Sequence, residues 1–457
     1  MKEIVGHDAD GCISTYVSTC EKDIYSPGRM KSEDNIDVMK NGLDQTVPFE
    51  TAFAAREIGL EDFLSSDDYH LEFTRMTEQL PLHNIYASNY LSIAEPYLTQ
   101  LVSPDNFKEI ISLAKHFPGN LTSFLGFECR LGVPKARTDW AFAISSVGKD
   151  RQVFFNLLND GYLPDQFLQQ NAWRHLNDFA NAWTDPNSVL RYNIKCFWLE
   201  FDMPESLPEI PIPSIFFGPE KIPKGKKVND FSNYEWLLTA ALPILKGHRL
   251  KKIIERRIKR CIEHLPENAS LFQVGTLLSR STDDIRLYIN HLNPKQIISY
   301  LNTIGWKDKT GEFVKLINEL ENKAERFVLS FDITDKGIGP RIGTELSFAS
   351  NEFFDNKIQW SQLLDYLVEK GWCLPEKRDA LLSYQSAENF SGGIMKPLTS
   401  ASQHLDDLIH SKIVRYINHI KIVYQPGKEI EAKAYPAVRL FKETKDEPEE
   451  QTTTLIQ

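Results

Sequence analysis

One pattern recurs along this chain and constrains its fold more than any other feature: two strand-like runs separated by a turn, with helical segments on either side. The runs are rich in aromatic and β-branched residues, and the breaks between them contain Gly or Pro, which is typical of β-hairpins. Four such pairs are visible: Phe124–Gly132 with Asp139–Ser145, Ile194–Asp202 with Ile212–Gly218, Arg326–Ile333 with Arg341–Phe348, and His419–Tyr424 with Ile430–Leu440.

The segments between the hairpins show apolar residues three or four positions apart, which predicts helices. They are Trp236–Leu245, Leu250–Leu265, Phe313–Ala324, Trp360–Lys370 and Leu405–Tyr416. Hairpin strands are antiparallel neighbours, so this order excludes a parallel α/β sheet. Hairpins that pair with one another tend to close into a barrel, because closure removes exposed edges. We therefore expect an α+β protein: an antiparallel β-barrel ringed by helices, with a flat α+β sheet as the alternative.

The domain organisation follows from composition along the 457 residues. The whole chain is 42% hydrophobic and 25% charged, the balance of a globular protein with a sizeable core. Residues 1–45 are polar and lack periodicity, so they are expected to form a flexible arm. Residues 46–441 contain no long linker and are expected to form a single domain. The charged, Pro-containing tail 442–457 is expected to be disordered.

Charge and targeting signals exclude several classes of protein. A net charge of −11 argues against a nucleic-acid-binding protein, whose affinity comes from Lys and Arg. No apolar run is long enough to span a bilayer, and the first residues lack a signal-peptide core. With six scattered cysteines and no secretion signal, we expect free thiols and a cytoplasmic location. No metal site is expected, because the cysteines are not clustered and no aspartate pair extends to Asp-Asp-x-x-Asp.

Two further motifs have simple structural interpretations. Gly337–Gly343 reads Gly-x-Gly-x-x-x-Gly before a strand-like run, so a hairpin turn is favoured over a dinucleotide-binding loop. Lys246–Arg260 is a basic amphipathic stretch. A solvated helix face is favoured there over a binding surface for an acidic partner or a membrane.

Several local strings, taken in order, resemble one known family. They are LTSFLGFECRL, WAFAISSVG, IPSIFFGP, FVLSFD, RIGTELSF and KIVYQPGKEIEAKAYPAV, within residues 85–441. This succession is similar to that of the ABBA (αββα) aromatic prenyltransferases, especially the dimethylallyltryptophan-synthase-like branch, in a divergent form. The resemblance implies a barrel of repeated αββα units. Such a barrel usually has five hairpins, so one more is expected than the four visible.

The resemblance also implies a reaction. Such an enzyme moves a short allylic prenyl group from its diphosphate to an aromatic or peptide substrate in natural-product biosynthesis, with no Mg²⁺ motif required. By resemblance, Glu128 is the candidate general base, while Arg130, Arg341, Lys433 and Tyr435 are the candidate substrate- and diphosphate-binding residues. The chemistry fits these residue types, because cations stabilise the leaving diphosphate, aromatic faces shield the carbocation and a carboxylate takes the proton.

Departures from the family pattern keep a second interpretation open. Gly343 and Glu345 stand where lysine and tyrosine are expected after Arg341, and Ala141 stands where an arginine is expected. Three acids on the strands, Glu200, Asp332 and Glu345, are possible lumen residues by strand alternation, with solvent or the helix ring as the alternative surroundings. The alternative is a divergent barrel that has lost prenyl diphosphate binding and binds or modifies a peptide or small molecule.

Overall fold

The computed structural model describes residues 86–442, apart from gaps at 123, 135–136, 147–149, 224, 281, 309–310, 350–355 and 390–410. All described residues belong to the unit Ile58–Gln457. The predicted arm 1–45 lies outside the described residues, as does the predicted tail 442–457 apart from Lys442, which is the last residue of a strand rather than disordered.

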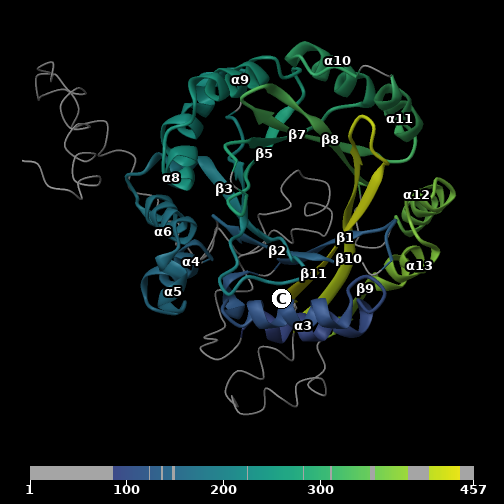
Figure 1. Ribbon diagram of the computed structural model, residues 1–457, viewed down its shortest axis with the longest axis horizontal. Helices are drawn as coiled ribbons and strands as arrows, with labels where there is room; N and C mark the ends of the chain where they lie inside the picture. The colour runs from purple at the N-terminus through teal and green to yellow at the C-terminus, as the bar shows by residue number, and fades with distance from the viewer. Residues whose placement is uncertain are drawn as a thin grey trace, which may run out of the picture. The chain divides into compact units, whose positions relative to one another are not determined.

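The strands form one antiparallel sheet that closes on itself (Figure 1). Each strand pairs with the next from β1 to β8, β8 pairs with β10, β10 with β11, and β11 returns to β1. Ten of the described strands therefore close the barrel. The eleventh, β9, pairs with the first part of β10, whereas β8 pairs with the last part of β10. The barrel prediction is confirmed, and the flat sheet is excluded. The strands are β1 Phe124–Arg130, β2 Asp139–Ser145, β3 Ile194–Phe201, β4 Ser214–Pro219, β5 Ser270–Thr276, β6 Ile285–Asn290, β7 Arg326–Thr334, β8 Gly337–Ser347, β9 Ser386–Asn389, β10 Ser411–Tyr424 and β11 Glu431–Lys442.

Helices fill the connections between hairpins and ring the outside of the barrel (Figure 1). The α-helices are α2 Ala87–Ala94, α3 Pro104–Ala114, α4 Asp150–Asn159, α5 Asp165–Gln169, α6 Asn171–Thr184, α7 Val189–Asn193, α8 Leu242–Lys246, α9 Lys252–Glu263, α10 Pro294–Ile304, α11 Glu312–Leu320, α12 Lys357–Glu369 and α13 Pro375–Tyr384. Short 3₁₀ turns occur at Glu95–Tyr97, Gly119–Leu121 and Phe231–Tyr234, and a π-helical turn at Leu237–Ala241 precedes α8. None of the described helices has the length and apolarity that crossing a membrane requires.

The main hydrophobic core lies between the barrel and its helices. Along β2, Trp140, Phe142 and Ile144 belong to this core and are fully buried. The ring of Phe117, from the turn after α3, packs 5.0 Å from that of Phe142. Because successive side chains on a strand point to opposite faces, the residues between these core positions face the lumen.

All four predicted hairpins are present, as β1–β2, β3–β4, β7–β8 and β10–β11. The fifth is β5–β6, between the second and third predicted ones. Residues 277–284 between its strands contain neither Gly nor Pro. The turn signal by which the other four hairpins were recognised is therefore missing here.

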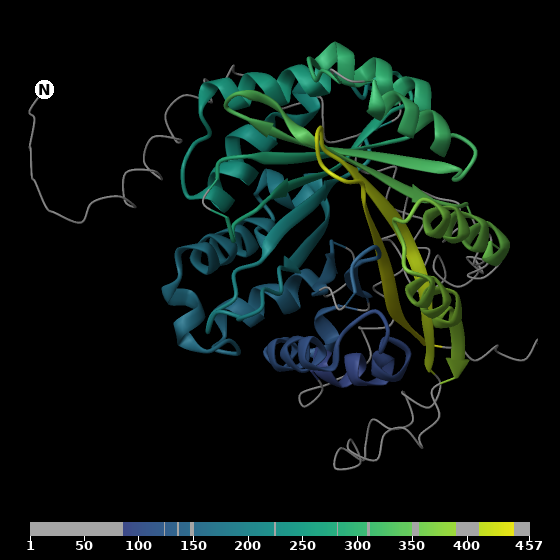
Figure 2. The ribbon, with the colours of Figure 1, turned by 45° about the vertical axis from the view of Figure 1, so that its right-hand side comes forward.

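One predicted helix is wrong in its second half. The spacing of Leu405–Tyr416 suggested a helix, but β10 begins at Ser411 and continues to Tyr424, while residues 405–410 lie outside the described residues. Its first part pairs with β9 on one side and β11 on the other. Figure 2 shows β10 and β11 in yellow as a long ribbon beside α12 and α13. Tertiary pairing has overridden the local apolar spacing.

Candidate functional site in the barrel lumen

The lumen contains a cavity of about 130 Å³. Its walls combine aromatic rings with carboxyl groups, an unusual mixture for a protein interior. The residues around it are Phe124, Gly126, Phe127, Glu128, Asp139, Ala141, Trp198, Glu200, Phe216, Phe272, Gln273, Tyr288, Val328, Glu345, Ser347, Asn418, His419, Tyr435 and Arg439.

Closure of the barrel brings together Glu128, Lys433 and Tyr435, which the resemblance had assigned to one site. Strands β1 and β11 pair antiparallel, with Arg130 opposite Lys433. The Glu128 carboxylate accepts hydrogen bonds from Lys433 Nζ and from the Tyr435 hydroxyl. Burial alone would raise the pKa of Glu128, but these two partners lower it to about 2. Glu128 is therefore ionised at neutral pH and is a weak base.

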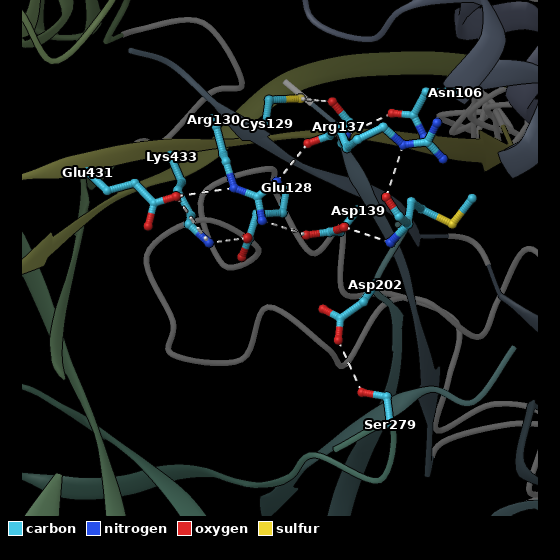
Figure 3. A network of polar contacts seen from close by, with 12 residues as sticks. Asn106, Glu128, Cys129, Arg130, Arg137, Asp139, Asp202, Ser279, Glu431 and Lys433 are labelled. Carbon is cyan, nitrogen blue, oxygen red and sulfur yellow. Dashed lines mark hydrogen bonds and ion pairs between the residues drawn. The ribbon is translucent and has the colours of Figure 1, made fainter. Parts of the chain in front are cut away.

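Glu431 neutralises the two arginines that the resemblance assigned to a diphosphate. Its carboxylate accepts from Arg130 Nε at 3.2 Å and from Arg341 Nη2 at 3.0 Å. Arg130 also lies 3.6 Å from the Asp139 carboxylate and donates to the carbonyl of Arg137. Figure 3 shows the guanidinium of Arg130 held between these acids. Both arginines therefore have carboxylate partners within the protein.

Glu345, which stands where the family pattern expects tyrosine, is bonded to a buried lysine. Lys421 Nζ donates to Glu345 Oε1 at 3.1 Å and to the Tyr288 hydroxyl at 3.1 Å. Burial alone would lower the pKa of Lys421, but Tyr288 and Glu345 raise it above its ordinary value. The second departure, Gly343, is explained by the same lysine: a Cβ at this position would lie 2.6 Å from Lys421 Cε.

His419 also borders Glu345, with its Nε2 3.7 Å from Glu345 Oε1. The ring of His419 stacks on that of Tyr435, with 4.0 Å between the ring centroids. Burial lowers the pKa of His419. The ring is therefore neutral at pH 7.

Asp332 forms a two-point ion pair with Arg286 on β6. Arg286 Nε and Nη2 donate to the two carboxylate oxygens at 2.7 and 3.1 Å. Arg286 shares a strand face with Tyr288, which borders the cavity. Asp332 was predicted as a lumen acid, and the structure adds its cation.

Glu200 differs from the other lumen acids. It lies on β3 at the cavity wall and has no hydrogen bond or ion pair among the described residues. Burial, reinforced by the nearby carboxylates of Glu128 and Asp139, raises its pKa to about 8. Glu200 is therefore mostly protonated at pH 7. Asp139, its neighbour, accepts a hydrogen bond from the Met203 amide, yet burial and Glu128 still raise the pKa of Asp139 to about 6.

Seven of the eight predicted site residues lie around the cavity or are bonded to Glu128 or Glu431: Glu128, Arg130, Glu200, Arg341, Glu345, Lys433 and Tyr435. The eighth, Asp332, is bonded to Arg286. Sequence reasoning missed Asp139, Arg286, Tyr288, Lys421 and Glu431. Arg286 and Tyr288 lie on the hairpin that was not found. Glu431 and Lys433 share a strand face by simple alternation, so that signal was present in the sequence.

Metal ligation has no support in this part of the chain: among the described residues, no group of three or more His, Cys, Asp or Glu side chains could hold a metal ion.

Comparison with known proteins gives similarity at the level of structure alone. No family model and no curated protein matches the sequence. The apo form of the prenyltransferase PriB is 12% identical, covering 78% of this chain and 99% of that chain with a TM-score of 0.45. AnaPT from Neosartorya fischeri is 12% identical, covering 76% and 93% with a TM-score of 0.43. NotF in complex with brevianamide F and DMSPP is 11% identical, covering 79% and 98% with a TM-score of 0.44. The chemistry of the lumen is therefore derived from its own side chains.

Proposed function

We propose that this protein binds a small organic molecule in the barrel lumen and modifies it by acid–base chemistry, without using a prenyl diphosphate. The observation that carries this proposal is the pairing of the lumen cations. Five of them are each bonded to a carboxylate of the protein: Arg130, Arg286, Arg341, Lys421 and Lys433.

A diphosphate needs cations whose charge is available to it, because its own charge must be compensated once it leaves water. Here the diphosphate would have to displace Glu431 from Arg130 and Arg341, and Glu128 from Lys433. Displacement would leave those carboxylates unpaired inside the barrel, which is costly. Arg439, another described cation that borders the cavity, packs over the rings of Phe124 and Tyr416 at 5.1 and 5.6 Å.

The size of the cavity supports a ligand with about one ring. A dry protein cavity of about 150 Å³ holds benzene, and this one measures about 130 Å³. Its aromatic wall includes Trp198, whose ring meets that of Phe124 edge-on at 4.8 Å, and Phe216, which meets Tyr288 at 5.7 Å. An apolar or aromatic body fits such walls, whereas a prenyl diphosphate together with an aromatic acceptor exceeds this volume.

Two carboxyl groups at the cavity have widely separated pKa values, and such pairs mark acid and base roles. Glu200, with a pKa of about 8, is mostly protonated in the empty cavity and can exchange its proton near neutral pH when a molecule binds. Glu128 is ionised and can stabilise positive charge that develops beside it. A group with a pKa of about 8 is well matched to proton transfer near neutral pH.

Binding of anions tests the proposal directly. We expect that neither dimethylallyl diphosphate nor inorganic pyrophosphate raises the melting temperature of the protein or gives heat in titration calorimetry. Glu431→Gln frees Arg130 and Arg341 and is expected to create measurable pyrophosphate binding. Glu319→Gln is the matched control, because it removes one exposed acid paired with Lys370 and leaves the lumen unchanged. Stabilisation of the wild-type protein by dimethylallyl diphosphate would falsify the proposal.

Prenyl transfer is the second candidate function, favoured by the meeting of Glu128, Lys433 and Tyr435 in one place. In this reading Glu128 is the base, and Arg130, Arg341, Lys433 and Tyr435 hold a prenyl diphosphate co-substrate. The acceptor would be an aromatic compound or peptide from natural-product biosynthesis. Mass spectrometry of reactions with dimethylallyl diphosphate and tryptophan-containing peptides tests this. A prenylated product that Glu128→Gln abolishes would establish prenyl transfer in place of the first proposal.

A further inference from the structure

We propose that the ligand of the lumen is an organic cation, such as an amine with an apolar or aromatic body, whose charged group is bound by Glu200. This inference rests on the proposed function, because it takes the lumen as the ligand site. It adds the chemical class of the ligand and the residue that selects it.

The position of Glu200 leaves room for a ligand group. On the neighbouring strands, Ala141 of β2 and Ser214 of β4 lie directly opposite Glu200. Both side chains are small, so no bulky neighbour covers the carboxyl from either side. Ala141 and Glu200 also both line the cavity.

Ser214 supplies a second observation at the same place. It is 0% exposed, and its hydroxyl has no hydrogen-bond partner among the described residues. It shares the lumen-facing side of β4 with Phe216, two residues further on. Buried hydroxyl groups are almost always hydrogen-bonded, so we expect a ligand group to bond to this hydroxyl. An ammonium group has three donors and can bond both the Glu200 carboxylate and the Ser214 hydroxyl.

The carboxylates of the lumen are otherwise already supplied with cations. Glu128 has Lys433, Glu345 has Lys421, Asp332 has Arg286, and Glu431 has Arg130 and Arg341. Glu200 is the lumen acid that forms no ion pair with a described residue, although the charges of Lys421 and Arg286 act on it from further away. A buried carboxylate without an ion-pair partner is unfavourable. A bound ammonium group would remove that cost, whereas a neutral ligand would leave Glu200 protonated.

Aromatic rings near Glu200 favour the same class of ligand. Trp198 lies two residues earlier on the same strand and lines the cavity, as do Phe216, Tyr288 and Tyr435. Organic cations are attracted to the faces of such rings, and carboxylate-bearing aromatic pockets commonly hold ammonium ligands. The same rings pack against the apolar part of the molecule.

Binding of a cation at Glu200 has a pH signature. The charged and titratable groups that face Glu200 are Glu128, Asp139, Asp202, Arg286, Tyr288, Lys421 and Tyr435. Before binding, the carboxyl is mostly protonated at pH 7, because its pKa is about 8. An alkylammonium group stays protonated below about pH 10. Its binding ionises Glu200 and releases one proton, so affinity should rise about tenfold from pH 6 to pH 7.

Benzylamine and benzyl alcohol are the matched probes, because they share a ring of the right size and differ in charge. Both probes carry one ring, which fits the volume of the cavity. We expect benzylamine to bind at least about tenfold more tightly than benzyl alcohol at pH 7.5, because only its ammonium group can pair with the Glu200 carboxylate. Titration calorimetry in phosphate and in Tris, whose heats of ionisation differ, should show release of close to one proton per benzylamine bound. Benzylamine affinity should also increase between pH 6 and pH 7.

Glu200→Gln is the decisive variant, because glutamine has the shape of the protonated glutamic acid and should preserve the fold. It should weaken benzylamine binding at least about tenfold at pH 7.5 and abolish both proton release and pH dependence. Ser214→Ala should weaken binding less, and Glu319→Gln should leave it unchanged. Equal affinity for both probes, or benzylamine binding that is independent of pH or of Glu200, overturns the inference while leaving a lumen ligand site in place. Binding of neither probe to the wild-type protein overturns both the inference and the proposed ring-sized ligand.

Discussion

The ion pair between Lys421 and Glu345 gives the sharpest test of how the lumen is held together. Lys421 is 7% exposed and Glu345 is 8% exposed, and they lie on the paired strands β10 and β8, directly opposite each other. Lys421 also donates to the Tyr288 hydroxyl. Glu345→Gln removes the negative charge while preserving the size of the side chain. It leaves a buried lysine whose hydrogen-bond partners, the Tyr288 hydroxyl and the new amide, are both neutral.

The expected cost follows from that loss of charge. Removing one partner of a buried ion pair typically costs about 3–5 kcal/mol of unfolding free energy. Because the Tyr288 hydroxyl remains bonded to Lys421, we expect about 2–4 kcal/mol for Glu345→Gln at pH 7. The pKa of Lys421 is raised in the folded protein, so its contribution to stability is fully present at pH 7 and is lost only in strong alkali.

Urea unfolding followed by tryptophan fluorescence measures the change. The double variant Glu345→Gln/Lys421→Met should recover most of the loss, because it removes both charges, and the cycle should give a coupling energy above about 1 kcal/mol. Glu319→Gln, at an exposed pair, should cost only about 0–1 kcal/mol. If Glu345→Gln costs no more than Glu319→Gln, the buried pair does not stabilise the lumen as argued.

Two other predictions concern the lumen. The raised pKa of Glu200 means that the folded state binds this proton more tightly than the unfolded state, so wild-type stability should fall as pH rises from about 4.5 towards about 8. Glu200→Gln should flatten that dependence, and parallel melting curves of the two proteins from pH 5 to pH 8 would contradict it. Gly275→Ala places a Cβ 2.6 Å from the Phe216 ring, so it should cost about 1–3 kcal/mol in urea unfolding. A variant as stable as the wild type would show that Phe216 is free to move away.

Four hairpins could be found from sequence because their information is local. Alternating aromatic and β-branched residues on either side of a Gly or Pro turn specify a hairpin wherever it occurs in the chain. The β5–β6 hairpin and the first part of β10 could not be found in this way. Residues 277–284 between β5 and β6 contain neither Gly nor Pro, so the local turn signal is missing. The first part of β10 has apolar residues at helical spacing, and its pairing with β9 and β11 makes it a strand.

The candidate residues could be predicted, but not their chemical state. Glu128, Lys433 and Tyr435 were identified from local strings, and Glu200 and Glu345 were named as possible lumen acids. Whether each group is charged, neutral, paired or unpaired was beyond reach, since Glu128 and Lys433 are 305 positions apart in the chain.

The sequence by itself determined that this chain is built from helix–hairpin units with acids and aromatic residues along the strands, because period-two alternation and turn residues act over a few positions. Only the tertiary structure decided that β11 closes on β1, that Glu431 neutralises Arg130 and Arg341, and that Glu200 forms no ion pair with the described residues. The physical reason is that charge compensation and desolvation depend on which distant groups meet. In a closed barrel that meeting is fixed by strand register rather than by neighbours in the chain.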